Sequence, residues 1–208
     1  MEVIKESKAG GLEENSSMIK ECIRSHGVIA FPTDTVNGIG CSPYDKLAIR
    51  KLLSIKSRDP KKGLPVLVSS KSSANMMGFM DKNARVLAER FWPGALTLVV
   101  KLKNKKISAY ASKDGKIALR MPDNAIALEL ARLCGGAIIG TSANISGKKT
   151  LSMSRIEREL DGIDIAIEGY AGHSGKNSTI FDTVEMRIMR GGEISKKEIE
   201  KEIGKDIL

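Results

Sequence analysis

Three short loops rich in hydroxyl, amide and cationic side chains hold the residues of this chain that are best suited to chemistry. They are residues 32–38, 56–58 and 141–147. None of them contains a histidine or a cysteine, so they suit the binding and orientation of a polar anion better than nucleophilic attack. The loops therefore point to a site for phosphate together with a small polar substrate.

The hydroxyl and cationic groups in and near these loops fall into two kinds. The hydroxyls and amide can recognise an ammonium, a carboxylate or a ribose, although single loop hydroxyls usually bond to neighbouring backbone. Arginines at element ends can grip phosphate or carboxylate with two parallel bonds, although most surface arginines are only solvated. The candidates are Thr33, Thr35, Ser142, Asn144, Ser146 and Ser178, with Arg58, Arg120 and Arg190, and the point charges Lys56 and Lys62.

Short apolar runs and helical periodicity predict how the loops are positioned. Residues 28–31 and 137–139 read as buried strands before the first and third loops. Apolar residues from Tyr44 to Ile55 recur at helical spacing and predict a helix that delivers Lys56 and Arg58. Because open α/β sheets bind ligands at loops off strand ends, we expect the ligand there.

The rest of the chain alternates between predicted strands and helices. Strands are expected at 64–68, 95–100, 116–120, 163–167, 178–181 and 184–189. Helices are expected after the caps Ser16 or Ser17 (ending at Gly27), Asp81, about Asn124, and the capping boxes that start at Ser154 and Ser195. Strands that follow strands directly, mixed with strand–helix units, predict one α/β domain over residues 1–208. It is expected to contain a mixed sheet with helices on its faces.

Charge is unevenly distributed along the chain. Lysine and arginine number 34 against 25 acidic residues, a formal charge of +9. Residues 46–62 hold seven basic residues and residues 101–116 hold six, each stretch with one acidic residue. A solvated surface explains such stretches, and so does a polyanionic or nucleotide partner. With aromatics at 4 %, a stacking platform for single strands is disfavoured, which leaves duplex shape and phosphate contact.

Several function classes are excluded or disfavoured by what the sequence lacks. Three cysteines without a Cys-x-x-Cys spacing suggest neither a disulfide framework nor a zinc site. Neither glycine-rich phosphate motif, of the Walker or the dinucleotide type, occurs. The chain has only two histidines, His26 and His173, and a hydrolytic triad is unsupported. Residues 1–10 lack an apolar core and no stretch approaches the ~20 apolar residues of a membrane span. A cytoplasmic protein is expected.

Eight motifs occur in an order and spacing that resemble the YrdC/TsaC family of threonylcarbamoyl-AMP synthases. They are PTDTVNGIG, KSR, KGLPVLV, FWPGALTLV, RMP, TSANISG, STIFD and RGG. Linked motifs are far more specific than single ones. The resemblance covers roughly residues 16–192 and leaves 193–208 as a short helical extension. It implies a twisted mixed α/β sheet with a large basic concave face.

The resemblance also implies a reaction. L-Threonine, bicarbonate and ATP would yield L-threonylcarbamoyl-AMP and pyrophosphate, a nucleotidyl transfer, with Mg²⁺ held mainly by the ATP phosphates and no metal ligands from the protein. A downstream threonylcarbamoyl transferase would use the product to make t6A at adenosine 37 of tRNA. Threonine carbamate can attack the α-phosphate without a protein nucleophile, so positioning and charge neutralisation would supply the catalysis.

The family's contacts transfer onto matching positions. Those implied for L-threonine are Thr35, Arg120, Ser142 and Ser178, and those implied for ATP are Lys56, Arg58, Lys62, Asn144, Ser152 and Arg190, with Lys56 and Arg58 also catalytic. The family usually has an aromatic residue where Asn37 stands, so part of the pocket wall is expected to differ. Asp59-Pro60 and Lys62-Gly63 also depart from the commoner pattern.

Two other functions compete with the synthase. The basic face could dock double-stranded RNA or tRNA while the nucleotide site is vestigial, in which case affinity falls steeply with salt. A carbamoyl-transfer domain of a larger assembly is disfavoured by length. Only the synthase requires a threonine pocket, so threonine dependence discriminates among them.

Overall fold

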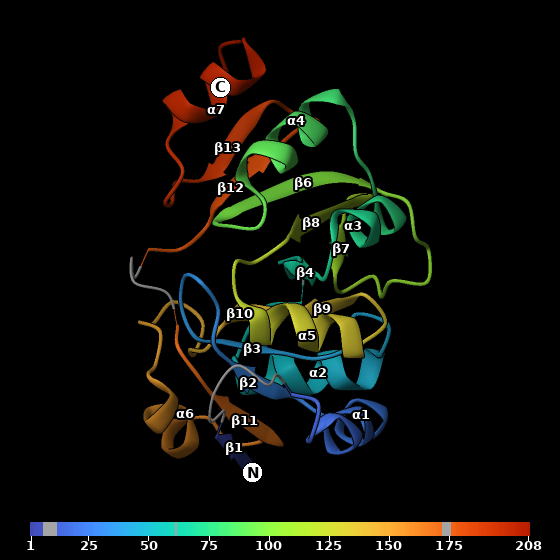
Figure 1. The fold of residues 1–208 in the computed structure, drawn as a ribbon, viewed down its shortest axis with the longest axis vertical. Coiled ribbons are helices and arrows are strands. Elements are labelled where there is room, and N and C mark those ends of the chain that lie inside the picture. Colours follow the sequence, from blue (N-terminus) through green and yellow to red (C-terminus); the bar gives the residue numbers. More distant parts are fainter. Residues whose placement is uncertain (6–11, 61, 172–175) are drawn as a thin grey trace.

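The computed structural model describes residues 1–5, 12–60, 62–171 and 176–208, so Lys61 and His173 lie outside the described residues. Its described strands form two sheets, which lie one above the other in Figure 1. The smaller has the order β1 (Glu2–Lys5), β11 (Ile165–Glu168), β2 (Ile29–Phe31), β3 (Gly38–Gly40) and β10 (Thr141–Ser142).

The larger sheet has eight strands. Its main path runs through β13 (Arg187–Arg190), β12 (Thr179–Asp182), β6 (Leu96–Leu102), β8 (Lys116–Arg120), β4 (Val66–Val68) and β9 (Ala137–Ile139). Two short strands flank this path: β5 (Gly78–Phe79) pairs with β6 and β7 (Ser112–Lys113) pairs with β8. Both sheets mix parallel and antiparallel pairs, which confirms the mixed α/β class.

The strands divide between two sheets, whereas the sequence predicted one. β9 pairs with β4 in the larger sheet, and β10, one residue later, pairs with β3 in the smaller one. Glycines permit this close crossing: a Cβ on Gly40 would collide with the Ile139 carbonyl, and one on Gly140 would collide with Leu67. Period-two sequence patterns define strands but do not reveal such a crossover.

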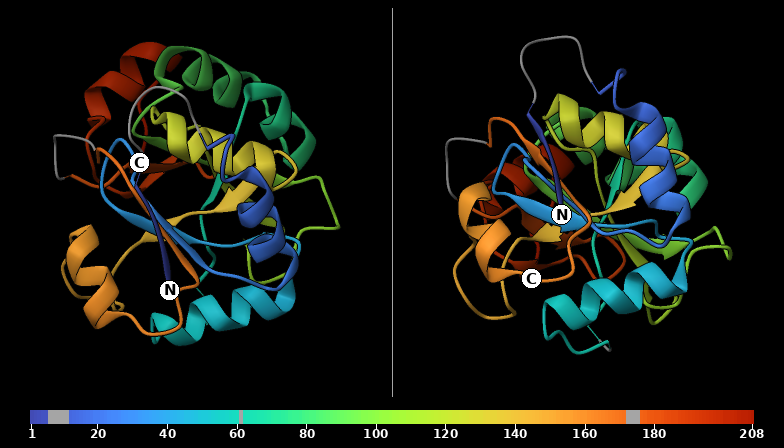
Figure 2. Two further views of the ribbon diagram at one scale, coloured as in Figure 1. Left: turned by 60° about the horizontal axis from the view of Figure 1, so that its bottom comes forward. Right: turned by 90° about the horizontal axis from the view of Figure 1, so that it is seen from below.

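Seven described helices cover the sheets (Figures 1 and 2). α3 (Lys71–Met77), α4 (Lys82–Phe91) and α7 (Lys196–Ile203) lie by the larger sheet, and α5 (Ala125–Leu133) packs on β4 and β9 near the junction. The smaller sheet is flanked by α1 (Ser16–Arg24), α2 (Lys46–Ile55) and α6 (Met153–Glu159). One buried cluster draws Ala30 and Ile39 from the smaller sheet together with Leu98 and Leu119 from the larger one.

Helix starts were predicted with mixed success. Asp81 and Asn124 cap α4 and α5, and the Ser195 capping box forms at α7. The predicted box at Ser154 is wrong, because α6 begins at Met153 and its N-cap is Ser152.

At α1 the N-cap is Asn15, so the predicted caps Ser16 and Ser17 already lie inside the helix. The left-handed residue after α1 is His26 (φ 61°) and not Gly27. Gly27 is needed for space, since a Cβ there would collide with the Cys22 sulfur. No described helix is long and apolar enough to cross a membrane.

Candidate functional site

A cavity of about 810 Å³ opens between the first loop, the segment after α2 and one face of the larger sheet. Its floor follows the alternation of strand side chains, because every second residue of a strand points to the same face. The floor residues are Thr97 and Val99 of β6, Lys116, Ala118 and Arg120 of β8, and Ile180 and Asp182 of β12, with Ser178 just before β12.

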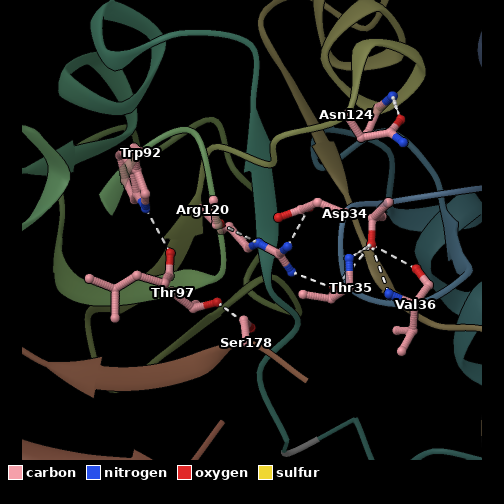
Figure 3. Close-up of polar contacts among 12 residues, drawn as sticks. Asp34, Thr35, Val36, Trp92, Thr97, Arg120, Asn124 and Ser178 are labelled. Atoms are coloured by element: carbon pink, nitrogen blue, oxygen red, sulfur yellow. Dashed lines mark hydrogen bonds and ion pairs between the residues drawn. The ribbon is translucent and has the colours of Figure 1, made fainter. Parts of the chain in front are cut away.

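Arg120 ties the first loop to the larger sheet (Figure 3). Its Nη2 donates to Asp34 Oδ1 at 2.5 Å, its Nη1 to Thr35 Oγ1 at 3.0 Å, and its Nε to the Gly94 carbonyl at 2.9 Å. The pair is shielded, with 7 % of the Arg120 side chain and 14 % of the Asp34 side chain exposed. Arg120 is therefore charge-compensated and fixes the position of Thr35.

The first loop also holds itself together. Thr33 Oγ1 donates to the Val36 carbonyl at 2.7 Å and accepts from the backbone N–H groups of Thr35 and Val36, both at 3.2 Å. This local use of a threonine hydroxyl is the structural alternative to ligand binding. Thr33 thus shapes the loop, and both Thr33 and Thr35 line the cavity.

Arg190 and Ser178 form a second cluster. Arg190 Nη2 donates to the Ser178 carbonyl at 2.8 Å and to Ser178 Oγ at 3.0 Å. Ser178 Oγ also contacts Thr97 Oγ1 at 2.8 Å (Figure 3). Burial, followed by the charges of Arg120 and Arg58, lowers the pKa of Arg190. A bound anion would relieve this repulsion.

Arg58 lines the same cavity and has a hydrogen-bond donor that is not used in the described part of the chain. Its Nη2 donates to the Gly63 carbonyl at 3.0 Å. Within the described residues its buried Nε has no hydrogen-bond partner, and burial lowers the pKa of its guanidinium. A buried donor without a partner is costly, so this arrangement favours an acceptor from a ligand. Exposed Lys62 adds charge at the rim.

Lys56 lies behind the third loop. The residue is 1 % exposed. Its ammonium donates to the Ser142 carbonyl, to the Asn144 carbonyl at 2.8 Å and to Asn144 Oδ1 at 2.7 Å. Asn144 Oδ1 also accepts from Ser142 Oγ at 2.8 Å. Burial, followed by the charge of Arg58, lowers the pKa of Lys56 to about 8. Lys56 therefore fixes the third loop while raising the local positive potential.

The structure brings most of the predicted site residues together. Those that line the cavity are Thr33, Thr35, Arg58, Lys62, Arg120, Ser142, Ser178 and Arg190. Lys56 and Asn144 support Ser142 from behind. Ser152 caps the start of α6, where its Oγ contacts Ser154 Oγ at 3.3 Å, and it is not among the described residues that line the cavity.

Two residues of the cluster were missed from the sequence, Asp34 and Thr97. Asp34 stands inside the PTDTVNGIG motif, where a carboxylate among hydroxyl and amide side chains was the available signal. Thr97 is a polar residue within an apolar strand, where a buried hydroxyl requires a partner. Both signals mark a residue as unusual without showing which side chain it meets.

Other chemistries find little support among the described residues. No group of three or more histidine, cysteine or carboxylate side chains that could hold a metal occurs there. Cys22, Cys41 and Cys134 are free, and burial raises the pKa of each thiol, to about 11 for Cys22 and Cys134. Such thiols are poor nucleophiles.

The two mixed sheets and the cavity lined by Arg58, Arg120, Arg187 and Arg190 define an α/β protein with several cationic side chains around one cavity. The chain belongs to the Sua5/YciO/YrdC family, described as telomere recombination, whose match covers residues 21–192. The resemblance deduced from the motifs is thereby confirmed.

Two curated threonylcarbamoyl-AMP synthases are similar to this chain. It is 34 % identical over 188 residues to a threonylcarbamoyl-AMP synthase of Bacillus subtilis (strain 168), covering 88 % of this chain and 54 % of the relative. The synthase of Pyrococcus abyssi (strain GE5 / Orsay) is also 34 % identical, over 187 residues, with 88 % and 55 % covered. The chain thus spans about half the length of these curated relatives.

Solved structures share the fold. P. abyssi Sua5 complexed with L-threonine matches with a TM-score of 0.88 and 31 % identity, covering 99 % of this chain and 61 % of that one. E. coli YciO matches with a TM-score of 0.81 and 25 % identity, covering 95 % and 98 %. The second match spans nearly the whole of both chains.

Proposed function

We propose that this chain is an L-threonylcarbamoyladenylate synthase, a nucleotidyltransferase that makes threonylcarbamoyl-AMP and pyrophosphate from L-threonine, bicarbonate and ATP. The observation that carries the proposal is the placement of Arg58 and Arg190 beside Thr35 and Ser178 in one cavity. Relatives named for this activity and a related structure with L-threonine support it. The cavity, at about 810 Å³, lies within the usual range for small-molecule sites.

ATP would bind at the guanidinium groups of Arg58 and Arg190. Arg58 and Arg190 form no ion pair with a carboxylate among the described residues, so they are available to phosphate oxygens. Lys62 adds charge at the rim, Lys56 and Asn144 keep the third loop in place, and Ser152 completes the ATP contacts. Magnesium, bound mainly to the ATP phosphates, would neutralise charge as pyrophosphate leaves.

L-Threonine would bind where the first loop meets the larger sheet. Thr35 and Ser142 offer hydroxyls, and Arg120 and Ser178 complete the contacts. The amine combines with bicarbonate-derived CO₂ to form a carbamate, losing a proton. A carbamate oxygen then bonds to the α-phosphorus of ATP while the bond between that phosphorus and the pyrophosphate oxygen breaks. The protein orients the reactants and stabilises the developing negative charge.

Two further proposals concern partners. The product would pass to a threonylcarbamoyl transferase that modifies tRNA at adenosine 37 in the cytoplasm. Because the chain carries a formal charge of +9, tRNA or double-stranded RNA would contact a basic face through its phosphates. Loss of RNA affinity with rising salt tests this contact, and salt-insensitive binding would contradict it.

Pyrophosphate release tests the proposed reaction. Purified protein is supplied with ATP and Mg²⁺, with L-threonine and bicarbonate together and each omitted in turn. We expect release to require both, and Lys56→Ala or Arg58→Ala to abolish it while the circular dichroism spectrum is unchanged. Release that needs neither substrate indicates an unrelated ATP hydrolase. No release from folded protein would overturn the synthase and favour the RNA-binding module.

A further inference from the structure

We infer that Thr97 is a positioning residue that directs the hydroxyl hydrogen of Ser178 toward a carboxylate oxygen of the amino-acid substrate. This inference rests on the proposed function and adds a residue that acts through Ser178. It follows from the set of hydrogen bonds that two buried hydroxyls on the cavity floor can make (Figure 3).

Ser178 Oγ accepts one hydrogen bond from an arginine and shares a second with Thr97 Oγ1. An arginine can only donate, so the contact from Arg190 Nη2 at 3.0 Å occupies one lone pair. Thr97 Oγ1 lies 2.8 Å away, and within the described chain it has no other hydrogen-bond partner. Ser178 and Thr97 together have two hydroxyl hydrogens, and the hydrogen bond between their side chains uses one of them. One O–H donor is therefore left over.

Exposure decides which hydroxyl keeps the free hydrogen. Ser178 is 5 % exposed and Thr97 is 1 % exposed, and both line the cavity. A hydrogen left on Thr97 would be the more deeply buried and the more costly to leave unpaired. Thr97 therefore donates to Ser178, and Ser178 presents its own hydrogen to the cavity.

The acceptor for this hydrogen is expected to be anionic. Arg190 donates to the same oxygen and makes Ser178 a stronger donor, because hydrogen bonds in a chain polarise one another. The positive charges of Arg120 and Arg58 lie close enough to Arg190 to lower its pKa. A carboxylate oxygen fits this donor, and Thr97 limits the rotation of the Ser178 hydroxyl.

Substitutions at Thr97 test this role by steady-state kinetics of pyrophosphate release. Thr97→Val keeps the shape and removes the hydroxyl, so KM for L-threonine should rise about 3- to 10-fold, with kcat and KM for ATP changed less than about 2-fold. Thr97→Ser should restore KM. Thr183→Val is the matched control, because Thr183 is also buried, at 4 % exposed, and donates to the Val99 carbonyl at 3.0 Å but does not line the cavity.

A double-mutant cycle separates positioning from direct contact. If Thr97 acts through Ser178, Thr97→Val adds no further rise in KM to Ser178→Ala. An equal rise in both backgrounds would overturn the inference, and so would a Thr97→Val protein that behaves like Thr183→Val. If Thr97→Val does not fold, Thr97→Ala takes its place with the same expected rise in KM.

Calorimetric titration with L-threonine separates this inference from the proposed function. If wild-type protein releases no pyrophosphate but binds L-threonine, and Thr97→Val binds it about 3- to 10-fold more weakly, the synthase proposal fails and the role of Thr97 stands. If wild-type protein binds no L-threonine, the role of Thr97 fails as well.

Discussion

The two ends of the cavity use positive charge in opposite ways. At one end, Arg58 and Arg190 donate only to carbonyl and hydroxyl oxygens among the described residues, and their pKa values are lowered by burial. At the other end, Lys116 donates to Asp182 at 2.8 Å and to Glu185, and Glu185 also pairs with Arg187 at 2.7 Å. The cations that form ion pairs stabilise the fold, whereas those that form no ion pair among the described residues are available to a ligand.

The largest expected effect compares two arginines of the same strand. β13 carries Arg190 at the first end and Arg187 at the second, and both line the cavity. Arg190→Ala should lower kcat/KM for pyrophosphate release about 100-fold, since it removes a charge from the phosphate site. Arg187→Ala should lower it less than about 3-fold, because the charge of Arg187 is already paired with Glu185. Equal losses would erase the distinction between the ends.

The free energy of unfolding should depend more on the second end of the cavity than on the first. Lys116→Ala leaves the Asp182 carboxylate, 2 % exposed, without its cation, so we expect the free energy of unfolding to fall by about 2 kcal/mol. Arg190→Ala relieves repulsion and should change it by less than about 0.5 kcal/mol. Urea denaturation measures both. Lys113→Ala is the control, an exposed lysine paired in register with Lys116. A larger loss for Arg190→Ala than for Lys116→Ala would contradict the comparison.

The lowered pKa of Lys56 predicts opposite pH trends for binding and stability. The pKa of Lys56 is about 8 in the folded protein, and its usual value is 10.5. As pH rises, Lys56 therefore loses its charge in the folded protein before it does so in the unfolded chain. Between these values the unfolded chain binds more protons, so the contribution of Lys56 to stability rises with pH, by up to about 3 kcal/mol.

ATP affinity, measured calorimetrically without threonine, should fall as pH rises through about 8, because the ammonium becomes neutral. Titration of the Lys56 side chain by NMR gives an independent value. A midpoint near 10.5 would remove the cause of both trends.

The smallest effect is expected at Ser152, outside the cavity lining. If it contacts ATP, Ser152→Ala should raise KM for ATP about 2- to 5-fold. The free energy of unfolding should be unchanged, because the Ser152 side chain makes no capping bond. Ser154→Ala is the matched control. An unchanged KM would remove Ser152 from the ATP site.

Local signals in the sequence predicted most elements and the loops of the site. β8 and β9 have the predicted bounds, and Asp81 caps α4 as expected. Short elements without clear periodicity were missed: β1, β3, β5, β7, β10 and α3. The hydrophobic pattern of a strand does not depend on which sheet it joins, so the division into two sheets could not be read locally.

Partners across the site were also beyond the sequence. Arg120 was predicted at the end of a strand, but its bond to Asp34 joins residues 86 positions apart. Lys56 was predicted at the end of a helix, yet its burial behind Asn144 depends on the path of the third loop. Residue types revealed the chemistry available, and tertiary packing decided which groups support the loops and which face the cavity.

A crystal structure with a non-hydrolysable ATP analogue and L-threonine would test the central claim most directly. We expect phosphate oxygens within hydrogen-bond distance of Arg58 and Arg190, and the amino acid's carboxylate beside Ser178. The ion pairs of Lys116 with Asp182 and Glu185 should remain intact. Phosphates bound at Lys116 and Arg187, with Arg58 and Arg190 left free, would contradict the account.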